Sequence, residues 1–243
     1  MANKLEMKIC RRDILKGFAA GAGGIFIESI TTPFQILYAA QDKTLVRREY
    51  KRVLLTDENK EPFRTSDIKK NENYIFFYPY HNIPVLLLNL NKTIEPMKVE
   101  QSEGVESYLH PGGTGRNKSI VAYVAVCTHE FIRPNPNESL VKYYPPGETS
   151  FIYGGDNVIC CCAHGSTFDP SNVGNVLQAP AEHPLTTVEL EWDSHTDSLY
   201  AKALMGWNPP FKEIFKEDGE GKIVAENTPV KKLSDYTKKI IKC

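Results

Sequence analysis

Two short stretches decide the interpretation of this chain: Cys127-Thr128-His129, and Cys161-Cys162-Ala163-His164-Gly165-Ser166. Each stretch offers one thiolate and one imidazole, spaced as C-x-H in the first and as C-x-x-H in the second. Together they supply two sulfur and two nitrogen ligands from two separate places in the sequence. Thiolates and imidazoles in such a set indicate a metal centre, because these are the donors that zinc and iron sites use.

Zinc is the first alternative for a set of two Cys and two His. Zinc sites usually pair ligands of one kind, as C-x₂₋₄-C and H-x₃₋₅-H, whereas each stretch here is mixed. A [2Fe–2S] cluster of Rieske type has two His in place of two Cys on one of its irons. A mixed pair lets each loop give one ligand to each iron, so the pattern favours this cluster over zinc.

The sequence after the second pair carries a family resemblance. Residues 161–169 resemble the second cluster loop of Rieske proteins, C-x-x-H-G-S-x-(Y/F)-D, and residues 179–185 resemble the proline-rich loop that covers the cluster. The resemblance spans about residues 45–205. It implies that a Rieske-type [2Fe–2S] cluster is bound, with Ser166 donating to a bridging sulfide. It also implies which side chains bind which iron: the inner iron takes Cys127 and Cys161, and the outer iron takes His129 and His164.

The departures from the family pattern are informative. Respiratory members carry a further cysteine in each loop, and the two form a disulfide; those positions here are Ile132 and Ala163. Where high-potential members have a tyrosine whose hydroxyl bonds a cysteine sulfur, this chain has Phe168. Since fewer hydrogen bonds to cluster sulfur lower the potential, we expect a midpoint below that of the quinol-oxidising type. A ligand role for Cys160 or Cys162 stays open but gives the wrong spacing to the following histidine.

Glu130 is a further departure, in a position where many respiratory members have leucine. A carboxylate beside His129 would favour the imidazolium or the oxidised cluster. The alternative is that Glu130 points into water.

Composition sets limits on the function. The 243 residues hold 29 Lys and Arg against 30 Asp and Glu, a formal charge of −1, which argues against bulk nucleic-acid binding. The six cysteines do not form the disulfide framework of a small secreted protein. We find no nucleophile constellation, phosphate-binding glycine loop or dinucleotide fingerprint. We expect no Rieske oxygenase either, since the remaining histidines offer no spacing for a second, catalytic iron site: His81, His110, His183 and His195.

The first forty residues resemble an export signal. Cys10-Arg11-Arg12-Asp13-Ile14-Leu15-Lys16 is similar to a twin-arginine motif, and a mild apolar stretch follows at residues 17–27. That route carries folded cargo, which suits a protein whose cluster is inserted before export. The apolar run is short for a membrane span, and Ala39 or Ala40 could precede a cleavage site. We expect the periplasmic side of the inner membrane, with the segment either kept as an anchor or removed.

The rest of the sequence predicts an all-β fold. Strand patterns occupy residues 51–55, 74–80, 85–90, 119–126, 187–192 and 198–203, and both ligand stretches follow strands. We expect a Rieske-type antiparallel β-sandwich at residues 45–208, with a small cluster-binding subdomain at about 120–186. Residues 92–118 and 131–150 look like insertions; the second could shield the cluster, dock a partner or be a plain surface excursion. A C-terminal extension at 209–243 would follow, either as a solvated tail or with a short helix at 234–242.

The cluster implies single-electron transfer, so the chain is expected to serve an oxidoreductase complex rather than to catalyse alone. The first hypothesis is the iron–sulfur subunit of a cytochrome bc-type complex, which takes electrons from quinol and passes them to a cytochrome c. The second is the small Rieske subunit of a periplasmic molybdenum oxidoreductase, similar to that of arsenite oxidase, whose partner is a molybdopterin subunit. No nucleic-acid partner is expected.

Overall fold

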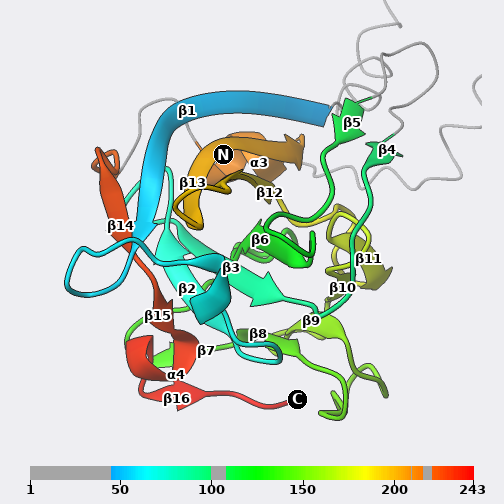
Figure 1. Ribbon diagram of the computed structural model, residues 1–243. Coiled ribbons are helices and arrows are strands. Elements are labelled where there is room, and N and C mark those ends of the chain that lie inside the picture. Colours follow the sequence, from blue (N-terminus) through cyan, green and yellow to red (C-terminus); the bar gives the residue numbers. More distant parts are fainter. Residues whose placement is uncertain (1–44, 100–107, 209, 216–220) are drawn as a thin grey trace, which may run out of the picture. The chain divides into compact units, whose positions relative to one another are not determined.

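A computed structural model describes residues 45–99, 108–208, 210–215 and 221–243. The expected export signal at residues 1–40 lies outside these described residues. Among them, no helix is long and apolar enough to cross a membrane. Strands dominate this part of the chain, and its helices are short (Figure 1), which confirms the all-β class: η1 (Thr65–Asp67), α3 (Pro210–Ile214) and α4 (Leu233–Tyr236).

The largest element is a sheet of eight strands in the order β14-β1-β13-β12-β6-β3-β2-β15. Its pairs are antiparallel except β1 with β14, which is parallel. The long strand β1 bends, with a register shift between Glu49 and Val53 (Figure 1). The bounds are β1 (Leu45–Thr56), β2 (Tyr74–Phe77), β3 (Pro84–Asn89), β6 (Ile120–Val124), β12 (Thr187–Asp193), β13 (Ser198–Trp207), β14 (Asn227–Pro229) and β15 (Lys231–Lys232).

Alternation along these strands gives the sheet two apolar faces. In β3, Val85 and Leu87 point into one core, whereas Leu86 and Leu88 point into another. The first core takes side chains from β1, β13 and β12 as well as from β6, β3 and β2. Both halves of the sheet therefore curl around one core, as expected for a sandwich of this kind.

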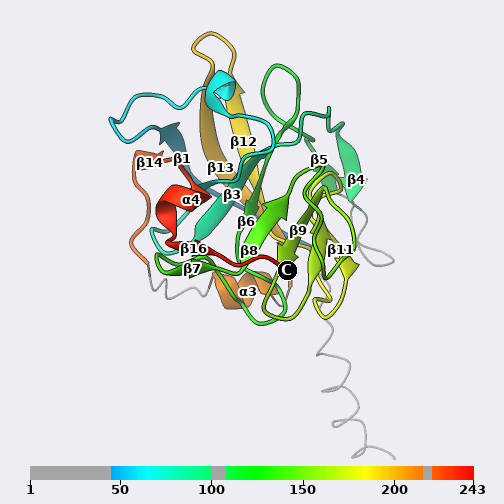
Figure 2. The same cartoon turned by 90° about the horizontal axis from the view of Figure 1, so that it is seen from below.

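The second core lies between the large sheet and a sheet of four strands, in the order β11-β10-β9-β8. Figure 2 shows these strands side by side at one flank of the molecule. Cys127, which follows β6, and Cys161, at the end of β9, both belong to this core. The four strands are β8 (Val141–Tyr144), β9 (Val158–Cys161), β10 (Thr167–Asp169) and β11 (Asn175–Gln178).

The two expected insertions contain strands. The first includes the hairpin β4 (Met97–Val99) and β5 (Tyr108–His110), whose residues pack beside β1 and β13. The second includes β7 (Glu138–Ser139) and the buried strand β8. A plain surface excursion at 131–150 is therefore wrong for its second half, because β8 completes the small sheet. The small separate sheet confirms the expected subdomain beside the main sheet, and β6, at the start of the range 120–186, belongs to the large sheet.

The C-terminal segment contributes strands to the sheets. Besides β14 and β15, it supplies β16 (Lys239–Ile240), which runs parallel to β7. The helix expected at 234–242 is wrong beyond its first residues, because α4 ends at Tyr236 and a strand follows. A solvated tail is wrong for residues 227–243 as well, where backbone pairing holds the segment against three other strands.

Candidate metal centre

The first ligand loop is a tight turn at the end of β6. The Cys127 N–H donates to the Ile132 carbonyl at 2.9 Å, and the Phe131 N–H returns to the Cys127 carbonyl at 2.9 Å. Phe131 takes a φ of +55°, in the left-handed region that closes such turns. The strand thus delivers Cys127 into the buried core, and the turn brings His129 back toward the surface.

The second ligand loop has a similar construction at the end of β9. The Cys161 N–H donates to the Ser166 carbonyl at 2.8 Å, and the Gly165 N–H donates to the Cys161 carbonyl at 2.9 Å. Gly165 has a φ of +87°, and a Cβ there would lie 2.9 Å from Ile152 Cγ2. Glycine at this position therefore serves both the turn and the close approach of a neighbouring loop.

The four predicted ligands converge. The Cys127 and Cys161 thiols are both 1% exposed and lie within hydrogen-bonding reach of one another. The rings of His129 and His164 lie 5.1 Å apart between centroids, edge to face at 85°. The sulfur pair is inside and the imidazole pair is toward the surface, where the His164 side chain is 43% exposed. This arrangement matches an inner sulfur-bound iron and an outer nitrogen-bound iron.

An orphaned buried atom shows that this place suits a metal group. His129 Nδ1 is buried and has no hydrogen-bond partner among the described residues. Buried polar atoms are rarely left so, because the lost hydration goes uncompensated. A metal bond to Nδ1 would satisfy it.

The environment of the thiol pair favours the loss of one proton, that of Cys127. The hydrogen bond with Cys161 lowers the pKa of Cys127 to about 6 against the opposing effect of burial, and backbone N–H groups of His129 and Glu130 and the Ser166 side chain add to the lowering. The same thiol–thiol bond, together with burial, raises the pKa of Cys161. Since the thiolate is the form that binds metal, one sulfur is ready near neutral pH, and binding iron would displace the second proton.

Ser166 links the second loop to the proline-rich loop. Its hydroxyl oxygen accepts a hydrogen bond from the Ala181 N–H at 3.0 Å, and it bonds the Cys127 sulfur. The first loop is tied to the same cover, since the Thr128 hydroxyl donates to the His183 carbonyl at 2.6 Å. The segment 179–185 thus holds both ligand loops, as a cover over the centre would.

The neighbouring cysteines are excluded as ligands by the direction of their side chains. Cys160 bonds Ser150 at 3.3 Å and Thr167 at 3.5 Å, and it packs in a separate small core. Cys162 forms a disulfide with Cys243. Strand alternation explains both, because β9 turns Cys160 away from the second core into which Cys161 points. The disulfide was missed in the sequence, where residue 243 is 81 positions away from residue 162.

Glu130 has turned toward the second histidine. Its Oε2 lies 3.7 Å from His164 Nε2, and its side chain is 56% exposed. One oxygen of Glu130 and one nitrogen of each histidine lie within 4.8 Å of one another. The carboxylate is therefore close enough to act on the outer end of the centre, although it remains in contact with water.

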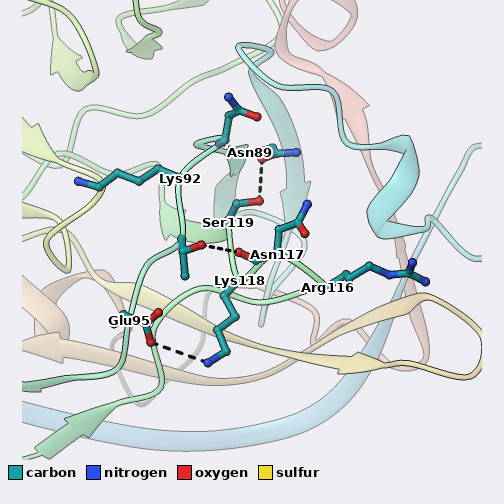
Figure 3. Close-up of a pocket in the computed structure, with 9 residues that line it drawn as sticks. Asn89, Lys92, Glu95, Arg116, Asn117, Lys118 and Ser119 are labelled. Carbon is teal, nitrogen blue, oxygen red and sulfur yellow. Dashed lines mark hydrogen bonds and ion pairs between the residues drawn. The ribbon is translucent and has the colours of Figure 1, made fainter.

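A polar groove on the loops at residues 89–95 and 116–119 is a separate feature (Figure 3). Asn89 and Ser119 are joined across it at 2.9 Å, and Lys118 pairs with Glu95 at 3.8 Å. Lys92 and Arg116 point away from one another. The groove lies at the far ends of β3 and β6 from the cysteines and contains neither thiol nor imidazole, so it does not form part of the metal centre.

Comparison with known families settles the nature of the centre. Residues 95–189 match the family model of the Rieske [2Fe-2S] domain, and this range contains both ligand loops and the proline-rich cover. This stretch is a Rieske [2Fe–2S] domain. Among solved structures, the chain is similar to the soluble domain of the Rieske protein II from Sulfolobus acidocaldarius. The identity is 24%, the match covers 63% of this chain and 77% of that one, and the TM-score is 0.43.

The family implies a Rieske-type [2Fe–2S] cluster, and the site fits it in donor set and in the buried, unpartnered nitrogen. A cluster of this type carries one electron at a time between redox partners. The protein around it supplies the rest: β6 and β9 fix the sulfurs, the turns place the imidazoles at the surface, and the Rieske cover keeps water from the inner half.

Proposed function

We propose that this Rieske protein is the electron-transfer subunit of a membrane-associated, quinol-oxidising complex of cytochrome bc type. Cys127 and Cys161 would bind the inner iron, His129 and His164 would bind the outer iron, and Ser166 would bond a cluster sulfide. The observation that carries the assignment is the contrast between two sealed cysteines and a half-exposed His164. Its outer nitrogen is available to donate a hydrogen bond to quinol or to a partner protein.

Export by the twin-arginine route is part of the proposal. The Cys162–Cys243 disulfide supports it, because disulfides persist in oxidising compartments such as the periplasm and are rare in the cytoplasm. We therefore place the domain on the periplasmic side of the inner membrane, with residues 1–40 as signal or anchor.

The small Rieske subunit of a molybdenum oxidoreductase is the second candidate. Two sequence features favour it: Ile132 and Ala163 stand where respiratory members have the loop-to-loop disulfide, and Phe168 replaces the tyrosine of high-potential members. Both features suit a donor other than a high-potential quinol chain. The two candidates share the cluster and its ligands, and differ in the partner.

Spectroscopy of single variants tests the ligand set. The reduced protein should give an EPR signal of low average g, which arises from nitrogen ligation. Cys161→Ser should lose this signal and Cys160→Ser, one residue away on the other face of β9, should keep it. A signal of the all-cysteine type, or loss of the signal in Cys160→Ser alone, would contradict the proposal.

Native purification tests the complex. Solubilised membranes should yield the protein together with a cytochrome b, and quinol should reduce the cluster in that preparation. Co-purification with a large molybdopterin subunit, and cluster reduction by that subunit's oxyanion substrate, would instead establish the second candidate.

A further inference from the structure

The second ligand loop is covalently attached to the C-terminal segment. Cys162 lies between the two predicted ligands of this loop and is joined by a disulfide to Cys243. The C-terminus lies beside β8 and β9 in Figure 2, and Figure 1 shows it below these strands, on the side away from the large sheet. The disulfide therefore holds the loop from the side away from the large sheet, and it does not occupy the space of the ligand sulfurs.

A buried tyrosine fixes the other end of this attachment. The Tyr144 hydroxyl accepts the Cys243 N–H at 2.7 Å and lies 3.5 Å from Cys243 Sγ and 3.7 Å from Cys162 Sγ. Tyr144 belongs to β8 and is 1% exposed. The Cys243 carbonyl accepts the Phe151 N–H at 2.7 Å. The disulfide is thus anchored on a rigid strand and does not hang from a free tail.

The loop held by the disulfide supplies hydrogen bonds to the predicted ligand Cys161. The Cys161 sulfur accepts from the backbone N–H groups of Ala163 and His164. The Cys162 N–H, between them and the ligand, donates to the Leu140 carbonyl at 2.7 Å. Hydrogen bonds to a ligand sulfur favour the more electron-rich, reduced cluster. Any loosening of residues 162–164 would weaken these bonds.

We propose that the Cys162–Cys243 disulfide is a positioning clamp for the second cluster loop, and that opening it lowers the midpoint potential of the cluster. The inference rests on the proposed function, since it presumes that Cys161 binds the cluster. A covalent tie restricts the conformations open to the loop, which keeps the N–H groups aimed at the sulfur. The Cys162–Cys243 disulfide restrains the second loop from the C-terminal side. Ile132 and Ala163 cannot form a disulfide that would restrain the two loops against each other.

The clamp can be opened chemically. Both cysteines are partly exposed, so a small reductant can reach them. Reduction breaks the S–S bond, and two electrons and two protons convert it to two thiols; the donor is a phosphine in the test below and a dithiol protein in a cell. The folded protein can then be compared with itself in two covalent states.

The experiment measures the cluster midpoint by EPR-monitored titration of the holoprotein before and after phosphine treatment, with thiols counted by alkylation and mass spectrometry. At a fixed potential, the reduced-to-oxidised ratio should fall about threefold on opening the clamp, roughly 30 mV at 59 mV per tenfold. Cys243→Ser, Cys162→Ser and the double variant should each show this same fall. The fall in the double variant should be no larger than in the single variants, because all three break the same link. Cys160→Ala, which removes a neighbouring thiol outside the link, should keep the wild-type midpoint and its response to phosphine.

Two results would overturn the clamp while leaving the proposed function intact. One is an unchanged midpoint after the disulfide is shown to be open, with the Rieske signal at full intensity. The other is the absence of a Cys162–Cys243 cross-linked peptide from the oxidised protein. A wild-type protein without the Rieske signal would instead overturn the proposed function, and the clamp with it. The phosphine arm needs no variant, so a folding defect in Cys243→Ser does not obscure the answer.

Discussion

Phe168 is the residue whose environment bears most directly on the potential. Its side chain is fully buried in the core that contains Cys127 and Cys161. Phe168→Tyr restores the hydroxyl by which the tyrosine of high-potential Rieske members bonds a cysteine sulfur, and a net stabilisation of the reduced cluster by about 1 kcal/mol corresponds to roughly 40 mV. A redox titration should show that rise. Phe168→Leu has no donor and should leave the midpoint at or below the wild-type value; a rise in both variants, or in neither, would contradict the argument.

Glu130 should lower the midpoint potential, whereas a tyrosine hydroxyl at position 168 should raise it. Its carboxylate lies 3.7 Å from His164 Nε2 and favours the oxidised, less negative cluster. Glu130→Gln should therefore raise the midpoint. Both side chains are more than one third exposed, so the effect is screened and should stay below about 1 kcal/mol, roughly 40 mV.

Ionic strength provides the check on this charge effect. The difference between wild type and Glu130→Gln should shrink as salt is raised, because screening shortens the reach of a surface charge. Glu138→Gln, on β7, is the control and should match wild type at every salt concentration. A salt-independent difference would mean that the amide alters the loop itself.

The four candidate ligands could be chosen from the sequence because their chemistry is local. A mixed C-x-H and C-x-x-H pair identifies the cluster whatever the surrounding fold, and the structure brings all four side chains together. Glu130 could not be placed in this way, since its neighbour across the centre comes from the other loop. The partner of Cys162 was equally invisible, because nothing local in the sequence relates it to residue 243.

At the scale of elements, the hairpin β4–β5 depends on one buried ion pair. The Glu189 side chain is 4% exposed and accepts bonds from Arg47 at 2.8 and 2.9 Å and from the Tyr108 hydroxyl of β5. Burial acts to raise the pKa of Glu189, but the bonds from Arg47 and Tyr108 outweigh it and lower the pKa. The carboxylate therefore favours the folded state wherever it is ionised.

Glu189→Gln should lower the free energy of unfolding by about 2 kcal/mol at pH 7, less than for a fully buried pair because Arg47 is one third exposed. A lowered folded pKa gives stability that is present above the unfolded value of about 4.5 and is lost as pH falls through the folded value. Urea unfolding at pH 7 and in acid should show that the difference in the free energy of unfolding between wild type and Glu189→Gln becomes smaller as the pH falls. Glu191→Gln, on the same strand as Glu189, removes an exposed ion pair with Arg52 and should lower the free energy of unfolding by less than about 0.5 kcal/mol.

Strong strands were predictable from their pattern, and weak ones were not. The pattern at 119–126 became β6 because a continuous apolar run is buried on both faces, and the alternating polar and apolar pattern at 187–192 became β12. The segments β14 to β16 carry many lysines and little alternation, so their strands exist only through pairing with partners already in place. Pairing of that kind is set by the whole fold, and no local signal in residues 227–240 announces it.

At the scale of the whole domain, the predicted ligands come from two sheets that share one of the two large cores. The large sheet curls around a core that contains none of the four predicted ligands, whereas both cysteines lie in the core shared with the small sheet. The first ligand pair follows β6 of the large sheet, and the second follows β9 of the small one. A cluster bound to both loops would therefore cross-link the sheets and add its binding free energy mainly to the small one.

Removal of iron should accordingly loosen the small sheet and spare the part of the large sheet that surrounds the first core. Hydrogen exchange of the protein with and without its cluster should show faster exchange in β9 and β10, while β1, β12 and β13 keep their protection, because the first core needs no ligand to remain packed. The Cys162–Cys243 link should be kept closed in both samples, so that only the cluster differs. Loss of protection in all five strands together would mean that the two cores unfold as one unit and that the cluster is required for the whole fold.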